Sequence, residues 1–255
     1  MAAGTGAGMV AANAAPPANV GPPYPFTEAI FTDDVVPLKN GAMITESEHG
    51  YIYHAGQQDG HLTVTMAGGA LRFHDTATAR WEKLVAGCHE VNVNKGVAAV
   101  CSVPGYVSAS RPLLLEVWPR LGDDFTSGRT LPASIAMAVL GDAGDDVAKL
   151  GAGPDFFNGA FGRDRVVGGP GNDWLRTGED DDVIRGGTGN DYLMGVAGAD
   201  VILGAGGNDR IGGDQGDDRL FAGSGADVLG CGTGSDDAKI DSSDSARDCE
   251  AVVRK

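Results

Sequence analysis

A single apolar residue recurs every nine positions through the C-terminal half of the chain. From residue 141 to residue 239 the sequence divides into eleven consecutive nonapeptides, with no insertion or deletion between them. Their eighth place is always apolar: Ala148, Phe157, Val166, Leu175, Ile184, Leu193, Ile202, Ile211, Leu220, Leu229 and Ala238. Their sixth place is always aspartate: Asp146, Asp155, Asp164, Asp173, Asp182, Asp191, Asp200, Asp209, Asp218, Asp227 and Asp236. Two invariant columns at one fixed spacing predict a repeat architecture in which each nonapeptide is one structural unit.

Glycine is the third recurring feature of the nonapeptides. It holds the fourth place in all of them except 177–185, where Asp180 stands instead. The best-formed repeats are 168–176 (GGPGNDWLR), 186–194 (GGTGNDYLM) and 204–212 (GAGGNDRIG). Glycine permits left-handed backbone dihedrals and the close approach of two backbones. One inward apolar side chain per short strand can build a thin core between two facing strands. The pattern therefore predicts short strands joined by glycine-rich turns.

This run resembles the RTX (repeats-in-toxin, hemolysin-type) family of calcium-binding nonapeptides, whose pattern is GGxGxDxUx, where U is a large apolar residue. The resemblance covers 99 of the 255 residues. It implies an all-β fold, a parallel β-roll that is a right-handed β-solenoid. In such a roll the first six residues of each nonapeptide form a turn, the last three form a strand, and two nonapeptides complete one coil. The resemblance also implies that the turns bind calcium.

Two nonapeptides per coil would bring aspartates 18 residues apart onto the same side of the roll, one strand spacing or about 4.8 Å apart. One ladder would contain Asp155, Asp173, Asp191, Asp209 and Asp227, and the other Asp146, Asp164, Asp182, Asp200, Asp218 and Asp236. Neighbouring carboxylates at that distance repel by about 1 kcal/mol in water, and by several at a lower effective dielectric. A cation is therefore expected between them. Carboxylates and turn carbonyls in flexible geometry suit Ca²⁺ better than strictly octahedral Mg²⁺.

The predicted calcium ligands are the eleven aspartates together with turn residues of the best-formed repeats: Gly169, Gly171, Asn172, Gly187, Gly189, Asn190, Gly206 and Asn208. Five neighbouring pairs in one ladder and four in the other allow at most about nine ions. Departures from the pattern around Arg163, Ala199 and 177–182 predict fewer. The alternative is a roll that needs no metal, because Asn or Asp side chains hydrogen-bond to its turns.

The charge of the chain is concentrated in the repeats. The whole chain has 35 acidic and 19 basic residues and a formal charge of −16, and residues 141–239 carry 19 acidic and 8 basic residues. The net negative charge of the chain does not attract the negatively charged phosphates of nucleic acids. No run of 18 apolar residues offers a membrane span. We therefore expect calcium ions as partners, with neither nucleic acid binding nor a membrane span.

The flanks of the repeats are of a different kind. Residues 1–23 are rich in Ala, Pro and Gly and are expected to be a flexible N-terminal arm or the remnant of a leader. Residues 24–140 alternate apolar and polar positions, as in 61–66, which predicts a small β-rich domain. A degenerate repeat at 122–125 leaves open a start of the roll near residue 121. Because an open parallel roll needs its ends covered, this domain and residues 240–255 are expected to act as caps.

The four cysteines fall into two local pairs, Cys88 with Cys101 and Cys231 with Cys249. The absence of any CxxC spacing favours two disulfides over a metal cluster. Reduced core thiols and, more remotely, a zinc site are the alternatives. Disulfides imply an oxidising compartment. We therefore expect a secreted or surface-associated protein, a virion surface included.

Residues 24–140 contain none of the common catalytic signatures. His89 and Glu90 begin an HExxH motif, but the second histidine is missing, and neither GxSxG nor GxxxxGK[ST] occurs. Four other histidines (His49, His54, His61 and His74) are the candidates for a metal site in this region. We expect a non-enzymatic, calcium-binding structural or binding module. The alternatives are a surface or virion structural protein that uses the roll as a rigid scaffold, and an enzyme with an unrecognised site in 24–140.

Apolar residues also recur where a roll faces water. Phe156, Trp174 and Tyr192 each hold the seventh place, 18 residues apart, and are expected to form an outward column. One hypothesis is that this column contacts a protein partner or a second copy of the chain. The alternative is that aromatic residues simply favour strands and stack along a sheet.

Overall fold

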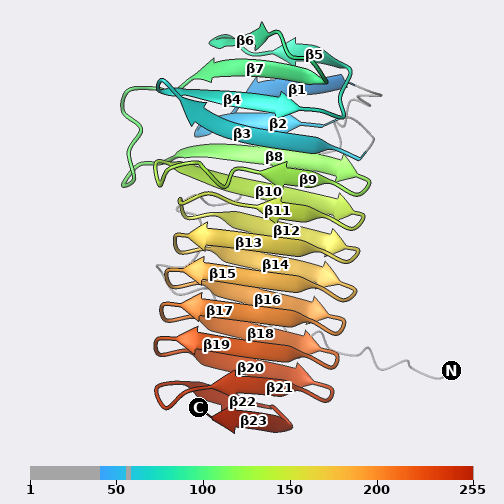
Figure 1. The fold of residues 1–255 in the computed structure, drawn as a ribbon, viewed down its shortest axis with the longest axis vertical. Coiled ribbons are helices and arrows are strands. Elements are labelled where there is room, and N and C mark those ends of the chain that lie inside the picture. The colour runs from blue at the N-terminus through green and yellow to red at the C-terminus, as the bar shows by residue number, and fades with distance from the viewer. Residues whose placement is uncertain (1–40, 56–58, 255) are drawn as a thin grey trace, which may run out of the picture.

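The computed structural model describes residues 41–55 and 59–254, and all the regular structure in these residues is β-strand. The expected N-terminal arm, 1–23, lies outside the described residues. The strands form two sheets that lie back to back along one long stack (Figure 1). This arrangement confirms the predicted all-β fold with a parallel β-solenoid.

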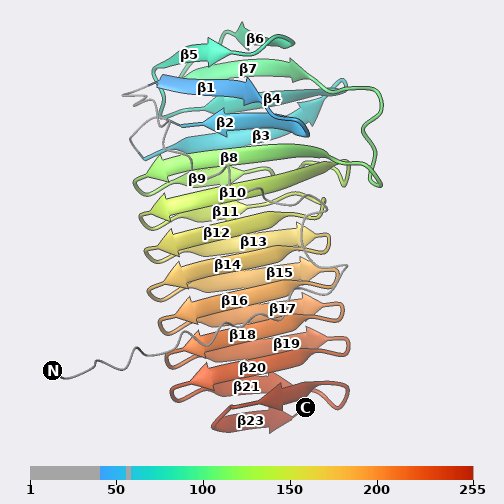
Figure 2. The ribbon, with the colours of Figure 1, turned by 180° about the vertical axis from the view of Figure 1, so that it is seen from behind.

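Each sheet is continuous from one end of the stack to the other (Figure 2). The first has eleven strands, in the order β22 (Ser245–Arg247), β20 (Val228–Thr233), β18 (Arg210–Gln215), β16 (Tyr192–Ala197), β14 (Trp174–Glu179), β12 (Phe156–Phe161), β10 (Ile135–Ala143), β8 (Leu113–Leu121), β2 (Gly50–His54), β1 (Gly41–Glu46) and β5 (Arg80–Leu84). The second has twelve, in the order β23 (Ala251–Arg254), β21 (Asp237–Ile240), β19 (Arg219–Ser224), β17 (Val201–Gly206), β15 (Val183–Thr188), β13 (Arg165–Pro170), β11 (Val147–Lys149), β9 (Phe125–Ser127), β3 (His61–Ala67), β4 (Ala70–Asp75), β7 (Val97–Ser102) and β6 (Cys88–Val91).

Successive nonapeptides alternate between the two sheets, so that each strand pairs in parallel with the strand 18 residues later. In β14 and β16, for example, Trp174 lies opposite Tyr192 and Leu175 opposite Leu193. The same offset holds between β13 and β15, where Val166 is the partner of Ile184 in the second sheet. Two nonapeptides per coil, as predicted, are thus the unit of the roll.

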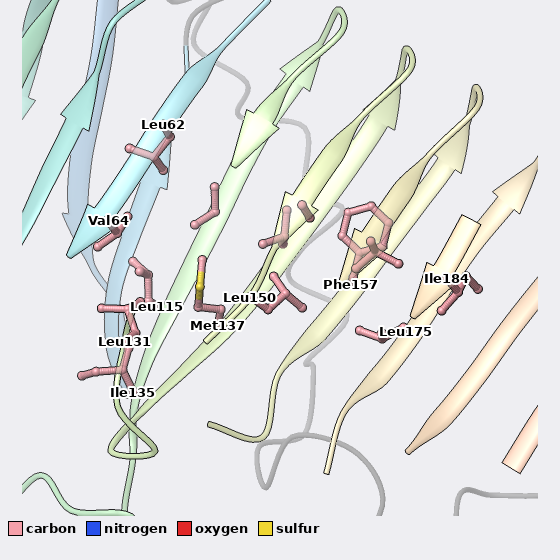
Figure 3. Close-up of a cluster of buried hydrophobic side chains, with 14 of the residues drawn as sticks. Leu62, Val64, Leu115, Leu131, Ile135, Met137, Leu150, Phe157, Leu175 and Ile184 are labelled. Atoms are coloured by element: carbon pink, nitrogen blue, oxygen red, sulfur yellow. The ribbon is translucent and has the colours of Figure 1, made fainter. Parts of the chain in front are cut away.

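The eighth-place side chains point between the two sheets and form the core. Each is at most 3 % exposed. Phe157, Leu175 and Ile184 lie in one row along the stack, which continues upstream to Leu115 and Leu62 (Figure 3). Full burial of such a side chain contributes about 1.5–3 kcal/mol. Because each repeat supplies only one large apolar group, the core of the roll is thin.

The predicted division of the nonapeptide is wrong in its extent. Six residues were expected in the turn, but β14 covers places seven to nine of one repeat and places one to three of the next, which leaves places four to six to the turn. The cause is backbone pairing beyond place nine: Gly178 and Glu179 still lie opposite Val196 and Ala197 of β16. The strands from β12 to β20 are therefore six residues long. In β14, Gly178 at place two has a φ of +135°.

Parallel stacking extends upstream of residue 141. β8 pairs in parallel with β10 and with β2, and β9 pairs in parallel with β11 and with β3. Antiparallel pairs, β1 with β2 and β3 with β4, occur only beyond these strands, at the end of the stack where β5 and β6 are the outermost strands. We propose residue 141 as the point where the nonapeptide sequence begins, with the described part of 24–140 as a β-rich unit continuous with the roll. Residues 24–40 and 56–58 of this predicted domain lie outside the described residues.

The C-terminal residues add a last, shortened coil. β22 pairs in parallel with β20, and β23 with β21. Both predicted disulfides are present: Cys231 is bonded to Cys249 of this coil, and Cys88 is bonded to Cys101 across β6 and β7. We propose that residues 240–255 cap the roll through this coil and its disulfide.

In the described part of the chain, no helix has the length and apolar character needed to cross a membrane.

Candidate metal centre

The sixth-place aspartates lie where the chain turns from one sheet to the other. Although they are ionisable, all eleven are at most 3 % exposed. Burial of a carboxylate is costly unless its oxygens are hydrogen-bonded or paired with a cation. Whether these turns can bind a cation therefore depends on which hydrogen-bond partners the two carboxylate oxygens have.

The first oxygen, Oδ1, is hydrogen-bonded along the ladder. The backbone N–H of Asp173 donates to Asp191 Oδ1, and that of Asp191 donates to Asp209 Oδ1, each at 2.9 Å. In the other ladder the N–H of Asp182 donates to Asp200 Oδ1 at 2.9 Å. Aspartates 18 residues apart are therefore direct neighbours, as the spacing predicts, and Oδ1 ties each turn to the turn before it.

The second oxygen, Oδ2, has no hydrogen-bond partner in ten of the eleven aspartates, although it is buried. The exception is Asp155, whose Oδ2 accepts the N–H of Gly151 at 2.8 Å. A buried polar atom left unpaired costs about 1–3 kcal/mol, and more when it is charged. A repeated unpaired carboxylate oxygen thus marks a place for a cation.

A backbone carbonyl oxygen of the next coil lies close to six of these carboxylates. A Cβ atom added to Gly168, at place one, would lie 2.3 Å from Asp173 Oδ2 and 2.7 Å from the carbonyl oxygen of Gly186. The carboxylate of one coil and the place-one carbonyl of the next therefore converge on one point, which we term the oxygen cradle. Among the described residues no three His, Cys, Asp or Glu side chains are grouped to hold a metal. Backbone carbonyls would have to complete the ligand set, and such all-oxygen sites suit Ca²⁺.

Burial raises the pKa of Asp164, Asp191 and Asp209 well above the ordinary value of 3.8. The pKa of Asp164 rises to about 8, that of Asp191 to about 7 and that of Asp209 to about 6. Loss of hydration is the largest cause in each case, the hydrogen bond to Oδ1 opposes it, and the charge of ladder neighbours adds to the rise. Without a cation, the folded roll thus holds protons on its aspartates at a higher pH than free carboxyl groups do.

We expect the metal-free roll to gain strand content when the pH is lowered from 8 to 5. A carboxyl whose pKa is raised on folding stabilises the fold fully below its unfolded pKa, near 4, and loses that contribution as the pH rises through 6 to 8. With calcium bound the trend should reverse, because protons then compete with the ion. Thermal melts followed by far-UV circular dichroism, on dialysed protein with and without excess calcium, measure both trends. Identical pH profiles in the two series would contradict this prediction.

The structure gives the predicted asparagine ligands another role. The side-chain Oδ1 of Asn172 accepts the backbone N–H of Asn190 at 2.8 Å, and Asn190 and Asn208 repeat this contact with the next coil. These side chains lie at place five, on the outer side of the turn, and tie coils together. The bonds expected for a metal-free roll are therefore present, but they leave the Oδ2 atoms unpaired.

Four of the five predicted glycines, all except Gly206, lie where backbones of successive coils are in close contact. A Cβ on Gly187 would lie 2.0 Å from the carbonyl oxygen of Gly169, and one on Gly189 would lie 1.6 Å from that of Gly171. The carbonyl of Gly206, at place three, accepts the N–H of Gly189 at 2.8 Å. These glycines permit the close stacking that brings the aspartates together, and their carbonyls remain proposed ligands.

Sequence reasoning missed the members of the ladders that lie outside the nonapeptides. Asp124 is 3 % exposed, its N–H donates to Asp146 Oδ1 at 2.9 Å, and its Oδ2 is unpaired. At the other end Asp244 accepts the N–H of Asp227, and Glu250 accepts that of Asp236. Spacings of 22, 17 and 14 residues replace the regular 18, so that the fixed period fails there. The GDDF string at 122–125 was the one available signal.

The histidines considered as another metal site have separate contacts. His54 Nε2 lies 3.1 Å from Thr45 Oγ1, and the ring of His61 packs on that of Phe125 with centroids 4.5 Å apart. These contacts belong to strand packing in β2 and β3 and do not form a common centre among the described residues.

The three outward aromatic residues do form one column, on the first sheet. The rings of Phe156 and Trp174 have centroids 5.5 Å apart, and those of Trp174 and Tyr192 are 5.7 Å apart, both pairs edge to face. All three side chains are half-buried. Stacking along the sheet accounts for this arrangement, and a partner for the column stays a prediction.

The repeats of the chain are similar to those of a known family. A model of the RTX calcium-binding nonapeptide repeat matches the chain four times, at residues 140–175, 159–193, 167–202 and 194–229. No curated protein matches the chain. The matches cover nine of the ten nonapeptides with an unpaired aspartate Oδ2, and the nonapeptide of Asp236 lies beyond them. Residues 140–229 therefore belong to the RTX family of calcium-binding nonapeptide repeats.

Proposed function

We propose that this protein binds several calcium ions along both edges of its roll and that the ions hold the roll folded. The observation that carries the proposal is the series of buried, unpaired Oδ2 atoms, one in every nonapeptide except that of Asp155. The sixth-place aspartates would hold the ions together with place-one carbonyls. A bound ion supplies positive charge between carboxylates that otherwise repel one another.

We further propose that the protein acts outside the cytosol. Two disulfides support this location, because they persist in oxidising compartments. Calcium is also abundant outside cells, whereas cytosolic calcium is low, so that export would supply the ions and permit folding. Measuring the location of the protein in its source cells tests this proposal, and a reduced, cytosolic protein would contradict it.

The role we propose for the loaded roll is structural or binding, without catalysis. Repeats of this family are typically non-catalytic. The second candidate is a rigid surface or virion scaffold, and the unbroken run of both sheets through the stack favours it (Figures 1 and 2). The two differ in assembly: a scaffold should be recovered in a particle or surface layer, whereas a soluble binding module should be recovered alone.

Calcium binding can be measured directly by equilibrium dialysis against Ca²⁺ or Mg²⁺, with the metal counted by atomic emission. We expect several Ca²⁺ per chain and far less Mg²⁺. Changing Asp173, Asp191 and Asp209 together to Asn should remove ions from one ladder. The matched control is Asp237→Asn, because Asp237 is exposed on β21. A wild-type chain that binds no calcium would overturn the proposal.

The aromatic column is proposed as a contact for a second copy or another protein. If so, Trp174→Ser with Tyr192→Thr should lower self-association or partner binding at least several-fold in the presence of calcium, because the contact loses two large side chains. Sedimentation velocity measures self-association, and circular dichroism checks that the variant is folded. Unchanged self-association and partner binding in a folded variant would favour stacking as the only role of these rings.

A further inference from the structure

The first place of the nonapeptide differs between repeats in a way that affects the oxygen cradle. Seven repeats have glycine there: Gly141, Gly159, Gly168, Gly186, Gly195, Gly204 and Gly213. A Cβ added to any of these glycines would lie 1.7–2.5 Å from the Oδ2 of the aspartate in the same repeat. A side chain at place one would therefore occupy the point on which the oxygens converge. The other four repeats carry such a side chain: Leu150, Thr177, Ala222 and Cys231.

Thr177 is the one such residue in the middle of the roll. Its side chain is fully buried, and its hydroxyl donates to the carbonyl oxygen of Gly195 at 3.3 Å. Gly195 O is the place-one carbonyl of the next coil, the equivalent of Gly186 O beside Asp173. Between Asp182 and Asp200 the Thr177 side chain thus lies where, in the turns with glycine at place one, the space between the aspartate Oδ2 and the next place-one carbonyl is open.

In a second turn, that of Asp155, backbone N–H groups are bonded to both carboxylate oxygens. Asp155 Oδ1 accepts the N–H of Met137 at 2.7 Å, and Asp155 Oδ2 accepts the N–H of Gly151 at 2.8 Å. Leu150, at place one of this repeat, is buried in the core. No carboxylate oxygen of Asp155 is left for an ion shared with Asp173.

We propose that the place-one residue decides which pairs of stacked turns bind an ion, an inference that rests on the calcium function proposed above. Each pair is named by its two aspartates. Seven pairs have glycine at place one of the first turn and are open, whereas 155/173 and 182/200 are closed by Leu150 and Thr177. Of the nine pairs, seven bind calcium. The upstream pair 124/146 carries Pro119 at the equivalent of place one and is closed by the same rule. Thr177 divides one ladder into two separate groups of sites.

Ala222 and Cys231 place the same restriction on the last coil. They precede Asp227 and Asp236, whose ladder neighbours are Asp244 and Glu250. Both place-one side chains are fully buried. The C-terminal coil is therefore joined to the roll by hydrogen bonds and the disulfide at Cys231, and it adds no ion.

The experiment is a count of bound calcium in variants of the full chain. Wild-type protein should bind seven ions, Thr177→Gly should bind eight, and Gly186→Thr should bind six. The matched control is Thr188→Gly, the same chemical change at an exposed place-three position, which should leave the count at seven. Thr177→Ser keeps the hydroxyl and should also bind seven. Circular dichroism in saturating calcium establishes that each variant is folded.

The possible results separate the two proposals. A wild-type chain without bound calcium overturns the proposed function and this inference with it. A wild-type count of nine, or equal counts for wild type and Thr177→Gly, overturns the inference while calcium binding stands. If Thr177→Gly does not fold, the Gly186→Thr variant decides: a count equal to wild type overturns the inference, and the loss of one ion supports it.

Discussion

Removal of calcium at pH 7.5 is expected to abolish most of the strand signal of residues 141–254. Each coil of the roll buries only two large apolar side chains, whereas ordering each residue costs about 1–2 kcal/mol of backbone entropy. The unpaired carboxylates add repulsion of about 1 kcal/mol or more per neighbouring pair. Bound ions offset both terms, because ligands that are assembled only in the folded state make metal binding a source of folding free energy.

Far-UV circular dichroism during titration with a chelator, followed by excess calcium, measures this loss and its reversal. The melting temperature should rise with the logarithm of free calcium above the dissociation constant. Residues 41–112 should keep part of their strands, because they contain antiparallel pairs and the disulfide between Cys88 and Cys101. Magnesium at equal concentration is the control. A strand signal that stays constant in excess chelator would contradict the prediction.

Substitution of Gly189 by alanine is expected to be among the most damaging single changes in the roll. Gly189 has a φ of +131°, and a Cβ there would lie 1.6 Å from the carbonyl oxygen of Gly171. Neither atom can move aside, since both belong to backbones that stack on further coils. Strained dihedrals alone cost about 1–3 kcal/mol, and with the clash we expect a loss of roughly 4 kcal/mol or more, at the upper end for single substitutions.

Gly68→Ala is the matched control for this change. Gly68 also has a positive φ, +60°, but a Cβ there would have no atom within 4 Å. Its cost should be about 1–2 kcal/mol, the cost of the left-handed region alone. Urea unfolding of both variants in saturating calcium gives the two free energies. If the two losses of unfolding free energy were equal, the strained backbone dihedral alone would account for the cost of Gly189→Ala, and the contact between coils would add nothing.

Several features of the fold could be predicted because the nonapeptide repeats without interruption. A fixed period of nine points every eighth-place side chain, such as Leu175, into the core. It also puts every sixth-place aspartate, such as Asp173, at a turn, whatever the remaining residues are. The two ladders, the burial of place eight and the outward direction of Trp174 and Tyr192 follow from this arithmetic. The pairing of the cysteines followed from their sequence separation and their even number.

Other features could not be predicted, because they depend on contacts between coils. The extension of the strands through places one to three depends on backbone pairing of Gly178 with Val196. The role of Asn190 depends on which N–H lies beside its amide oxygen in the next coil. Asp124 joins the ladder across a spacing of 22 residues, so that no period could identify it.

The sequence by itself determined that carboxylates and apolar side chains are repeated in register, since a periodic chain can satisfy its backbone by stacking identical turns. Only the tertiary structure decided which carboxylate oxygens have a partner. Asp155 and Asp173 occupy the same place in their repeats, yet a neighbouring N–H meets Oδ2 of the first and none meets that of the second. The physical reason is that Gly151 lies outside a strand, so that its N–H is available to Asp155, whereas the corresponding Gly169 lies within β13 and is paired with Gly187 of the next coil. The period of nine does not specify this difference.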